Sequence, residues 1–249
     1  MKNFKNALKM FSILLLLLST SCKKDEIKLE NKPEPTVNPI AATELLDYYL
    51  VAEHKAGAYR MMVAYFELSG NKVIVRAMRQ GNPIYPGIET HHEVMVDNGR
   101  INIDWNGDGR TAMYRFTIEK DASGKLTLKN YDFQFNGEGN LLNFAVLAKK
   151  TEALPFENFN FKMAAVGQPF EAVKNGIPLT FSKFMGGKVL YWPTKVIVTE
   201  QVEGYDNILN IGFLTTTYTL GVTVPYWKGI NTPIMLIEID SLLFMAAKQ

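Results

Sequence analysis

The sequence predicts a mainly β protein, an antiparallel barrel or sandwich with one short N-terminal helix. Two observations predict this class. Short segments alternate apolar and polar residues, as in Phe116-Thr117-Ile118-Glu119, which is the pattern of a half-buried strand. Turn-forming sequences such as Asn98-Gly99 separate these segments at short spacing, which is typical of antiparallel sheets.

A short helix is expected first, at residues 43–55. Thr43 can cap its amino end. Leu46, Tyr49 and Leu50 then recur at helical spacing, and His54 lies near the end of the same segment.

Seven strands are expected between residues 59 and 148, because each apolar or alternating segment there is bounded by a turn sequence. The turns include Ser69-Gly70-Asn71, Asn98-Gly99 and the segments 106–109 and 121–124. The expected strands are 59–68, 72–79, 91–96, 101–105, 111–119, 125–135 and 141–148.

The second half is less regular. Strands are expected at 156–163, 188–192 and 194–202, and in the first half of 233–246. Residues 207–224 form either one long bent strand or two, with Gly212 or Gly221 at a bulge.

Residues 43–249 are therefore expected to form a β-rich domain, either one unit or two subdomains that divide near residues 150–156. A barrel in the first half that resembles the lipocalin fold is one form of this architecture. Such a likeness of fold implies no function by itself.

The N-terminus has the pattern of a secretory signal, assigned to residues 1–21. Lys2, Lys5 and Lys9 make a basic start, and a short apolar run follows at residues 10–18. This run is too short for a membrane-spanning helix, which needs roughly 20 apolar residues.

The segment Leu18-Ser19-Thr20-Ser21-Cys22 resembles the lipobox of bacterial lipoproteins, with Ser19 in place of the usual leucine. The resemblance implies that the thiol of Cys22 receives a diacylglycerol, that cleavage makes Cys22 the first mature residue, and that its amine is acylated with a fatty acid such as palmitate. An ordinary signal peptide beside a buried free cysteine is the alternative.

The residues after Cys22 resemble the export tag of Gram-negative surface lipoproteins. Lys24, Asp25 and Glu26 supply the lysine and the two acids of this tag, which implies a place in the outer leaflet of the outer membrane, facing the extracellular side. A charged, solvated start of a tether is the alternative. Residues 22–42 are charged and rich in proline, and we expect them to form a disordered tether.

Composition excludes some function classes. The chain has 27 Lys and Arg against 25 Asp and Glu, and the signal removes three lysines, which leaves 24 against 25 and a net charge of −1. This balance disfavours nucleic acid as a partner. Cys22 is the single cysteine, so the core alone must hold the domain together.

One segment matches the start of a calcium-binding loop. Asp104, Asn106 and Asp108 are spaced as the first oxygen ligands of such a loop. Its twelfth position should be a glutamate and is Arg115 instead, so we interpret the segment as a plain turn between strands. No cofactor is expected.

Aromatic residues near strand ends are the candidate ligand contacts. Trp192 and Trp227 each follow a tyrosine, and Tyr85 and Trp105 could join them. Exposed aromatic rings stack on sugars or apolar ligands. Packing in the core is the alternative interpretation for each of them.

The sequence thus predicts an outer-membrane-anchored surface lipoprotein with a non-enzymatic β domain that binds an extracellular glycan or a small apolar molecule. The alternative is a structural or assembly partner of an outer-membrane complex. A hydrolase is a third hypothesis, which no nucleophile motif in the sequence supports.

Overall fold

The computed structural model describes the greater part of the chain after residue 39. The described residues are 40–80, 88–107, 109–154, 160–168, 171–184, 187–192, 195–202, 204–213, 219–239 and 242–248. The chain divides into the units Met1–Thr36 and Val37–Gln249. The predictions for the signal segment, Cys22, Lys24, Asp25, Glu26, Tyr85 and Asp108 lie outside the described residues.

The short N-terminal helix is present as η1 (Ala42–Asp47), a 3-10 helix. Its N-cap residue is Ala41 rather than Thr43, and no side chain caps it. The helix ends at Asp47, and the rest of the predicted helical segment is strand β1 (Tyr48–Ala56). The first seven residues of β1 are all buried, so the strand lacks the alternation that distinguishes a half-buried strand from a buried helix.

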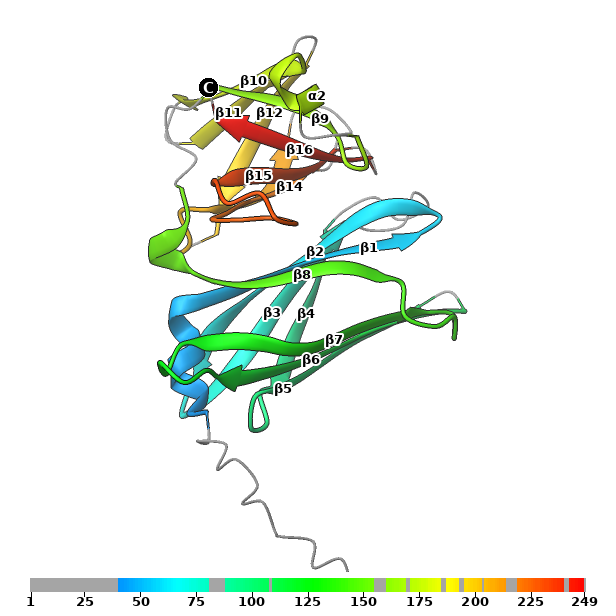
Figure 1. The fold of residues 1–249 in the computed structure, drawn as a ribbon, viewed down its shortest axis with the longest axis vertical. Coiled ribbons are helices and arrows are strands. Elements are labelled where there is room, and N and C mark those ends of the chain that lie inside the picture. The colour runs from blue at the N-terminus through cyan, green and yellow to red at the C-terminus, as the bar shows by residue number, and fades with distance from the viewer. Residues whose placement is uncertain are drawn as a thin grey trace, which may run out of the picture. The chain divides into compact units, whose positions relative to one another are not determined.

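The first part of the described chain, residues 40–154, forms two antiparallel sheets (Figure 1). We call it the sandwich half. The larger sheet has the order β4-β3-β2-β1-β8, and the smaller sheet has the order β5-β6-β7. The strands are β2 (Ala58–Ser69), β3 (Lys72–Gln80), β4 (Ile88–Met95), β5 (Arg100–Gly107), β6 (Arg110–Lys120), β7 (Leu126–Phe135) and β8 (Leu142–Lys149).

The inner faces of these two sheets enclose one apolar core. Leu50 and Met62 come from the larger sheet, and Ile103, Tyr114 and Phe133 come from the smaller one. Ile40, which the sequence assigned to the tether, is also buried in this core. The predicted Asn98-Gly99 turn is present: both residues have positive φ, and Asp97 pairs with Arg100 across it.

The rest of the described chain, residues 160–248, forms a closed antiparallel barrel, which we call the barrel half. Pairing runs from β9 through each following strand, and β16 pairs with β9 again (Figure 1). The strands are β9 (Asn160–Ala165), β10 (Ile177–Phe184), β11 (Gly187–Trp192), β12 (Lys195–Gln201), β13 (Ile208–Phe213), β14 (Thr219–Val224), β15 (Ile234–Ile239) and β16 (Leu242–Lys248). The helix η2 (Lys150–Glu152) follows β8, and α2 (Glu171–Lys174) lies between β9 and β10.

A second apolar core joins the larger sheet to the barrel. Tyr49 and Met61 contribute from β1 and β2, and Val222, Leu236 and Met245 contribute from barrel strands. The hydroxyl of Tyr49 also donates to the carbonyl oxygen of Thr223 over 2.8 Å. Strands β1 and β2 therefore have apolar neighbours on both faces.

The prediction of a mainly β, antiparallel fold is confirmed. In place of a lipocalin-like barrel, the described residues of the first half form two facing sheets, and the closed barrel lies in the second half. The described residues of the segment 207–224 form two strands, β13 and β14. None of the helices in the described part of the chain has the length and apolar character needed to cross a bilayer.

Candidate functional site

The β1–β2 hairpin places three charged or titratable side chains close together. Glu53 pairs with Met61 and His54 pairs with Arg60 in its register, and Gly57 forms the turn with a φ of 79°. Successive residues of a strand point to opposite faces. Glu53 therefore faces the barrel, as do Tyr49 and Val51, whereas His54 faces the interior of the sandwich half.

His54 is buried among aromatic rings in the sandwich interior. Its Nδ1 lies 3.0 Å from the hydroxyl oxygen of Tyr114, and its ring centroid lies 4.2 Å from that of Phe133. Burial, followed by the positive charges of Arg79 and Arg60, lowers the pKa of His54 to about 3. The imidazole is therefore neutral at physiological pH, and its partner is a buried phenol rather than an exposed nucleophile.

An aromatic row continues from His54 toward the turns that end the smaller sheet. Tyr114 lies 4.3 Å from Phe133 and 5.6 Å from Trp105 between ring centroids. The guanidinium of Arg79 lies over the Trp105 ring at 5.0 Å. Trp105 and Phe135 both pair with Ala112 in the register, and both are only partly buried. We call Trp105, Tyr114, Phe133 and Phe135 the aromatic end of the sandwich.

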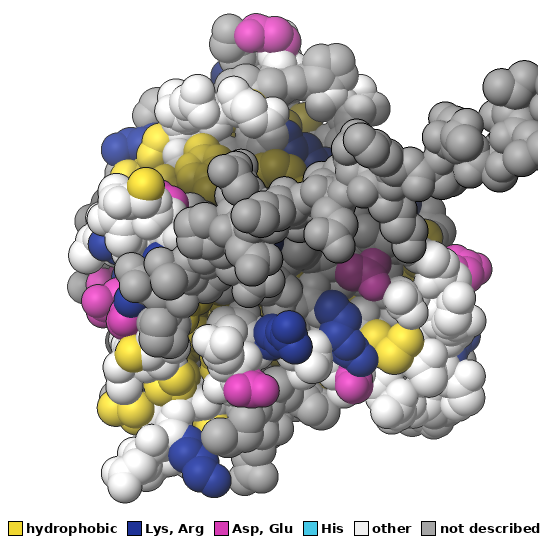
Figure 2. Space-filling model, turned by 60° about the horizontal axis from the view of Figure 1, so that its bottom comes forward, with side chains coloured by type: hydrophobic (Ala, Val, Ile, Leu, Met, Phe, Trp, Pro, Cys, Tyr) yellow, Lys and Arg dark blue, Asp and Glu magenta, His cyan; other side chains and the backbone are white. Residues whose placement is uncertain are grey.

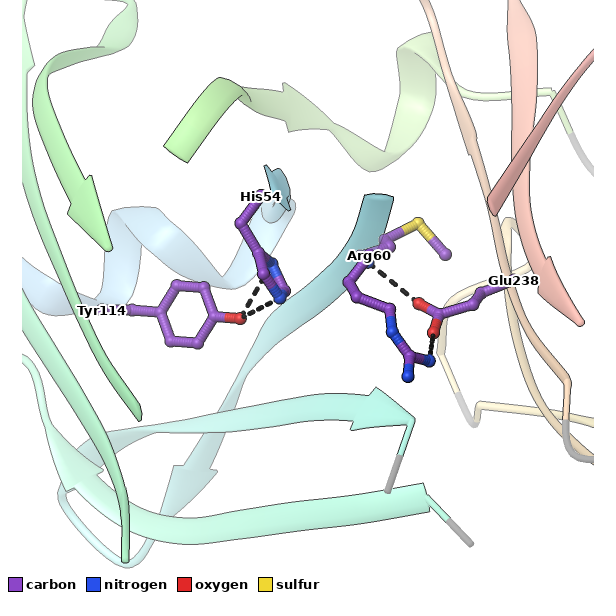
Figure 3. Close-up of polar contacts among 5 residues, drawn as sticks. His54, Arg60, Tyr114 and Glu238 are labelled. Carbon is purple, nitrogen blue, oxygen red and sulfur yellow. Dashed lines mark hydrogen bonds and ion pairs between the residues drawn. The ribbon is translucent and has the colours of Figure 1, made fainter. Parts of the chain in front are cut away.

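Strand β2 also holds a buried carboxylate from the barrel. The guanidinium of Arg60 donates to Oε1 of Glu238 over 2.6 Å, and the backbone N–H of Met61 donates to Oε2 over 2.9 Å. Figure 3 shows Arg60 and Glu238 pointing toward each other, with His54 and Tyr114 in contact beside them. Burial raises the pKa of Glu238, and the charge of Arg60 opposes this rise.

Glu53 makes a second ion pair, of the opposite polarity. Nζ of Lys228 donates to its Oε1 over 2.5 Å, and Nδ2 of Asn143 donates to the same oxygen over 3.3 Å. The other oxygen, Oε2, is buried and has no hydrogen-bond partner among the described residues. Lys228 is held at this position by a tight turn in which Trp227 pairs with Ile230.

The predicted ligand contacts have different surroundings. Trp227 is 1% exposed in the second core, with its ring 4.8 Å from Phe144 in a T-shaped contact. Its indole therefore has no face available to an exposed ligand. Trp192 is the last residue of β11, and its side chain lies outside the described part, as Tyr85 does. Trp105 is the one of the four whose described side chain is partly exposed beside other aromatic rings.

The described candidate calcium ligands lie on one strand. Asp104 and Asn106 belong to β5, and Asp108 lies outside the described residues. Nη1 of Arg115, the residue at the twelfth position, donates to Oδ1 of Asp104 over 2.5 Å. Among the described residues, no group of three or more acidic, histidine or cysteine side chains is placed to hold a metal ion.

The buried charged residues were not singled out from the sequence. Glu53 and His54 were assigned to a helix, where they would not occupy opposite faces of a sheet. A signal for Glu238 exists, because it is the single charged residue in the apolar strand IMLIEI. A charge in a fully buried strand requires a partner, although the sequence does not say which.

Comparison with known proteins identifies no relative of this chain. No family model, no curated protein and no solved structure matches it.

Proposed function

We propose that the protein is a lipid-anchored surface protein of a Gram-negative outer membrane, and that its non-enzymatic β domain binds a small apolar molecule or a glycan. The sequence around Cys22 carries the proposal. A basic start, a short apolar run and small residues lead directly to the single cysteine of the chain. An exported protein with one thiol has no disulfide partner for it within the chain, and lipidation accounts for this thiol.

The energetics favour a stable anchor at Cys22. Each buried methylene contributes about 0.8 kcal/mol, and one acyl chain binds a membrane only marginally. A diacylglycerol and an amide-linked fatty acid would exceed this limit together. The proline-containing segment after Cys22 would then hold the β domain away from the lipid surface.

The aromatic end of the sandwich supports the binding part of the proposal. Trp105 and Phe135 are partly exposed, and their neighbours Tyr114 and Phe133 form a buried floor of rings. Aromatic faces of this kind stack on sugar rings and on apolar ligands. On the face shown in Figure 2, Lys and Arg side chains lie among Asp and Glu side chains.

Cell fractionation of the Cys22→Ala variant tests the anchor. We expect the variant to leave the membrane fraction on a carbonate wash, and mass spectrometry of the wild type to find acyl groups on Cys22. Replacing Lys24, Asp25 and Glu26 together by alanine should protect the protein from protease added to whole cells. A variant at Cys22 that remains in the membrane, or an unmodified Cys22 in the mature protein, would refute the anchor.

Ligand titrations with the Trp105→Ala variant test the binding site. The probes are an apolar fluorescent dye, a medium-chain fatty acid and a set of soluble oligosaccharides. We expect at least one probe to bind the wild type and to lose about tenfold or more in affinity on loss of the stacking ring. The control is Tyr226→Ala, which removes an exposed ring in the barrel half. Equal affinities in Trp105→Ala and the control would contradict a site at the aromatic end.

A further inference from the structure

Two ion pairs, each with a buried carboxylate and a partly exposed base, connect the sandwich half to the barrel half with opposite polarity. In one pair the sandwich half supplies the acid, Glu53, and the barrel half supplies the base, Lys228. In the other pair the sandwich half supplies the base, Arg60, and the barrel half supplies the acid, Glu238. The side chains of Glu53 and Glu238 are 0% and 1% exposed, so both carboxylates are removed from water.

We propose that these two ion pairs act together as a charge key, in which complementary charges at two positions hold the barrel half docked on the larger sheet. The apolar contacts of the second core favour docking, but hydrophobic burial has no preferred direction. Ion pairs do have a preferred arrangement, because each charge attracts only a charge of the opposite sign. If a carboxylate replaced either base, two buried carboxylates or one unpaired buried carboxylate would result, and a buried charge without a counter-charge is strongly unfavourable.

The hairpin explains why the two pairs act together. Glu53 and Arg60 lie on neighbouring strands, one residue apart in the β1–β2 register. Lys228 and Glu238 are held by the turn after β14 and by β15, which pairs with β14 along its length. Glu53 and Arg60 thus belong to one β hairpin, and Lys228 and Glu238 belong to another. A shift of one hairpin against the other that breaks one ion pair therefore changes the geometry of the second pair.

The backbone amide of Met61 offers a direct measure of docking. Its N–H donates to Oε2 of Glu238, so its protection from hydrogen exchange depends on β2 and β15 remaining together. Met61 is also buried, which makes this amide inaccessible to solvent while the two halves are docked. Lys228 takes no part in this hydrogen bond.

The test is residue-resolved hydrogen exchange of the full-length protein in detergent micelles. Lys228→Glu places a second carboxylate beside Glu53, and we expect the Met61 amide to exchange at least about tenfold faster, as the loss of a close charge pair implies. The exchanged pair, Glu53→Lys with Lys228→Glu, restores opposite charges and should return the rate to within about threefold of the wild type. Lys72→Glu, a charge reversal at an exposed lysine of β3, is the control and should leave the rate unchanged.

Two results would overturn the charge key. One is an unchanged hydrogen-exchange rate of the Met61 amide in Lys228→Glu, which would mean that the two ion pairs act independently. The other is an exchanged pair whose Met61 amide exchanges as fast as in Lys228→Glu alone. If the exchanged pair does not fold, the neutral variants Lys228→Met and Glu53→Gln provide the test. The charge key requires the Met61 exchange rate of the double variant to change by less than the two single variants predict together, and additive changes would reject it.

Discussion

Replacing Trp227 by alanine distinguishes a core residue from a ligand contact. The indole is 1% exposed and its ring is in T-shaped contact with Phe144. The backbone hydrogen bonds between Trp227 and Ile230 do not involve the side chain, so the substitution leaves them in place. The loss therefore comes from the buried ring and from the cavity that it leaves, which together cost about 3–5 kcal/mol.

This cost is large against the total stability of the domain. Folded proteins are stable by about 5–15 kcal/mol, and a domain of 150–250 residues loses roughly 2–4 °C in Tm per kcal/mol. We therefore expect Trp227→Ala to lower Tm by about 6–20 °C. Urea unfolding gives the free energy directly, and an unchanged slope with denaturant would show that the two-state transition is preserved.

The neighbouring tyrosine provides the matched control. Tyr226 is 40% exposed, and Tyr226→Ala should cost about 1 kcal/mol or less. If Trp227→Ala were as mild as this control, the indole would not be a core residue. The interpretation of Trp227 as unavailable to ligand would then be wrong.

Two further predictions concern His54 and Gly176. The pKa of His54 is lowered from 6.5 to about 3 in the folded state, so between these two pH values the unfolded chain binds a proton that the folded chain does not. The free energy of unfolding should therefore decrease as the pH is lowered from 6.5 to 3, by up to about 1.4 kcal/mol per pH unit. NMR should find the His54 ring resonances constant from pH 8 to about 4.5, and a ring that titrates near 6.5 would contradict its burial. A Cβ at Gly176 would lie 2.0 Å from the carbonyl oxygen of Met163, so Gly176→Ala should destabilise the protein by about 1–3 kcal/mol or more in urea unfolding. Gly139→Ala, where a Cβ meets no atom within 4 Å, should be close to neutral, and equal losses in both variants would contradict the close approach.

Local patterns predicted the hairpins of the sandwich half because each depends on adjacent residues. The Ser69-Gly70-Asn71 turn joins β2 to β3, and Asn98-Gly99 precedes β5. The alternation of Phe116 and Ile118 with polar residues correctly predicted β6, whose inner face alone is buried. In these strands the information that selects the structure lies within a few residues.

Strand β1 was missed because its burial arises from distant parts of the chain. Its inner face packs on the smaller sheet and its outer face on the barrel, so the segment reads as a continuous apolar run. The second strand of the last hairpin, β16, was missed as well, since LLFMAAK has no alternation of polar residues. Such runs do not distinguish a strand from a helix without knowledge of what covers them.

The candidate site depends on the same long-range contacts. Arg60 and Glu238 are far apart in sequence, and neither lies in a recognisable motif. Trp105 was noted as an aromatic residue near a turn, but its association with Arg79 and Tyr114 follows from the pairing of sheets rather than from spacing.

The coverage of the larger sheet on both faces has a consequence for how the protein is made. A nascent chain that has completed only the sandwich half would leave Tyr49, Val51, Met61 and Val63 facing water until the barrel strands arrive. A contiguous apolar surface of this kind promotes association between incomplete chains. The interval between synthesis of the two halves is therefore when the protein most needs a holding chaperone.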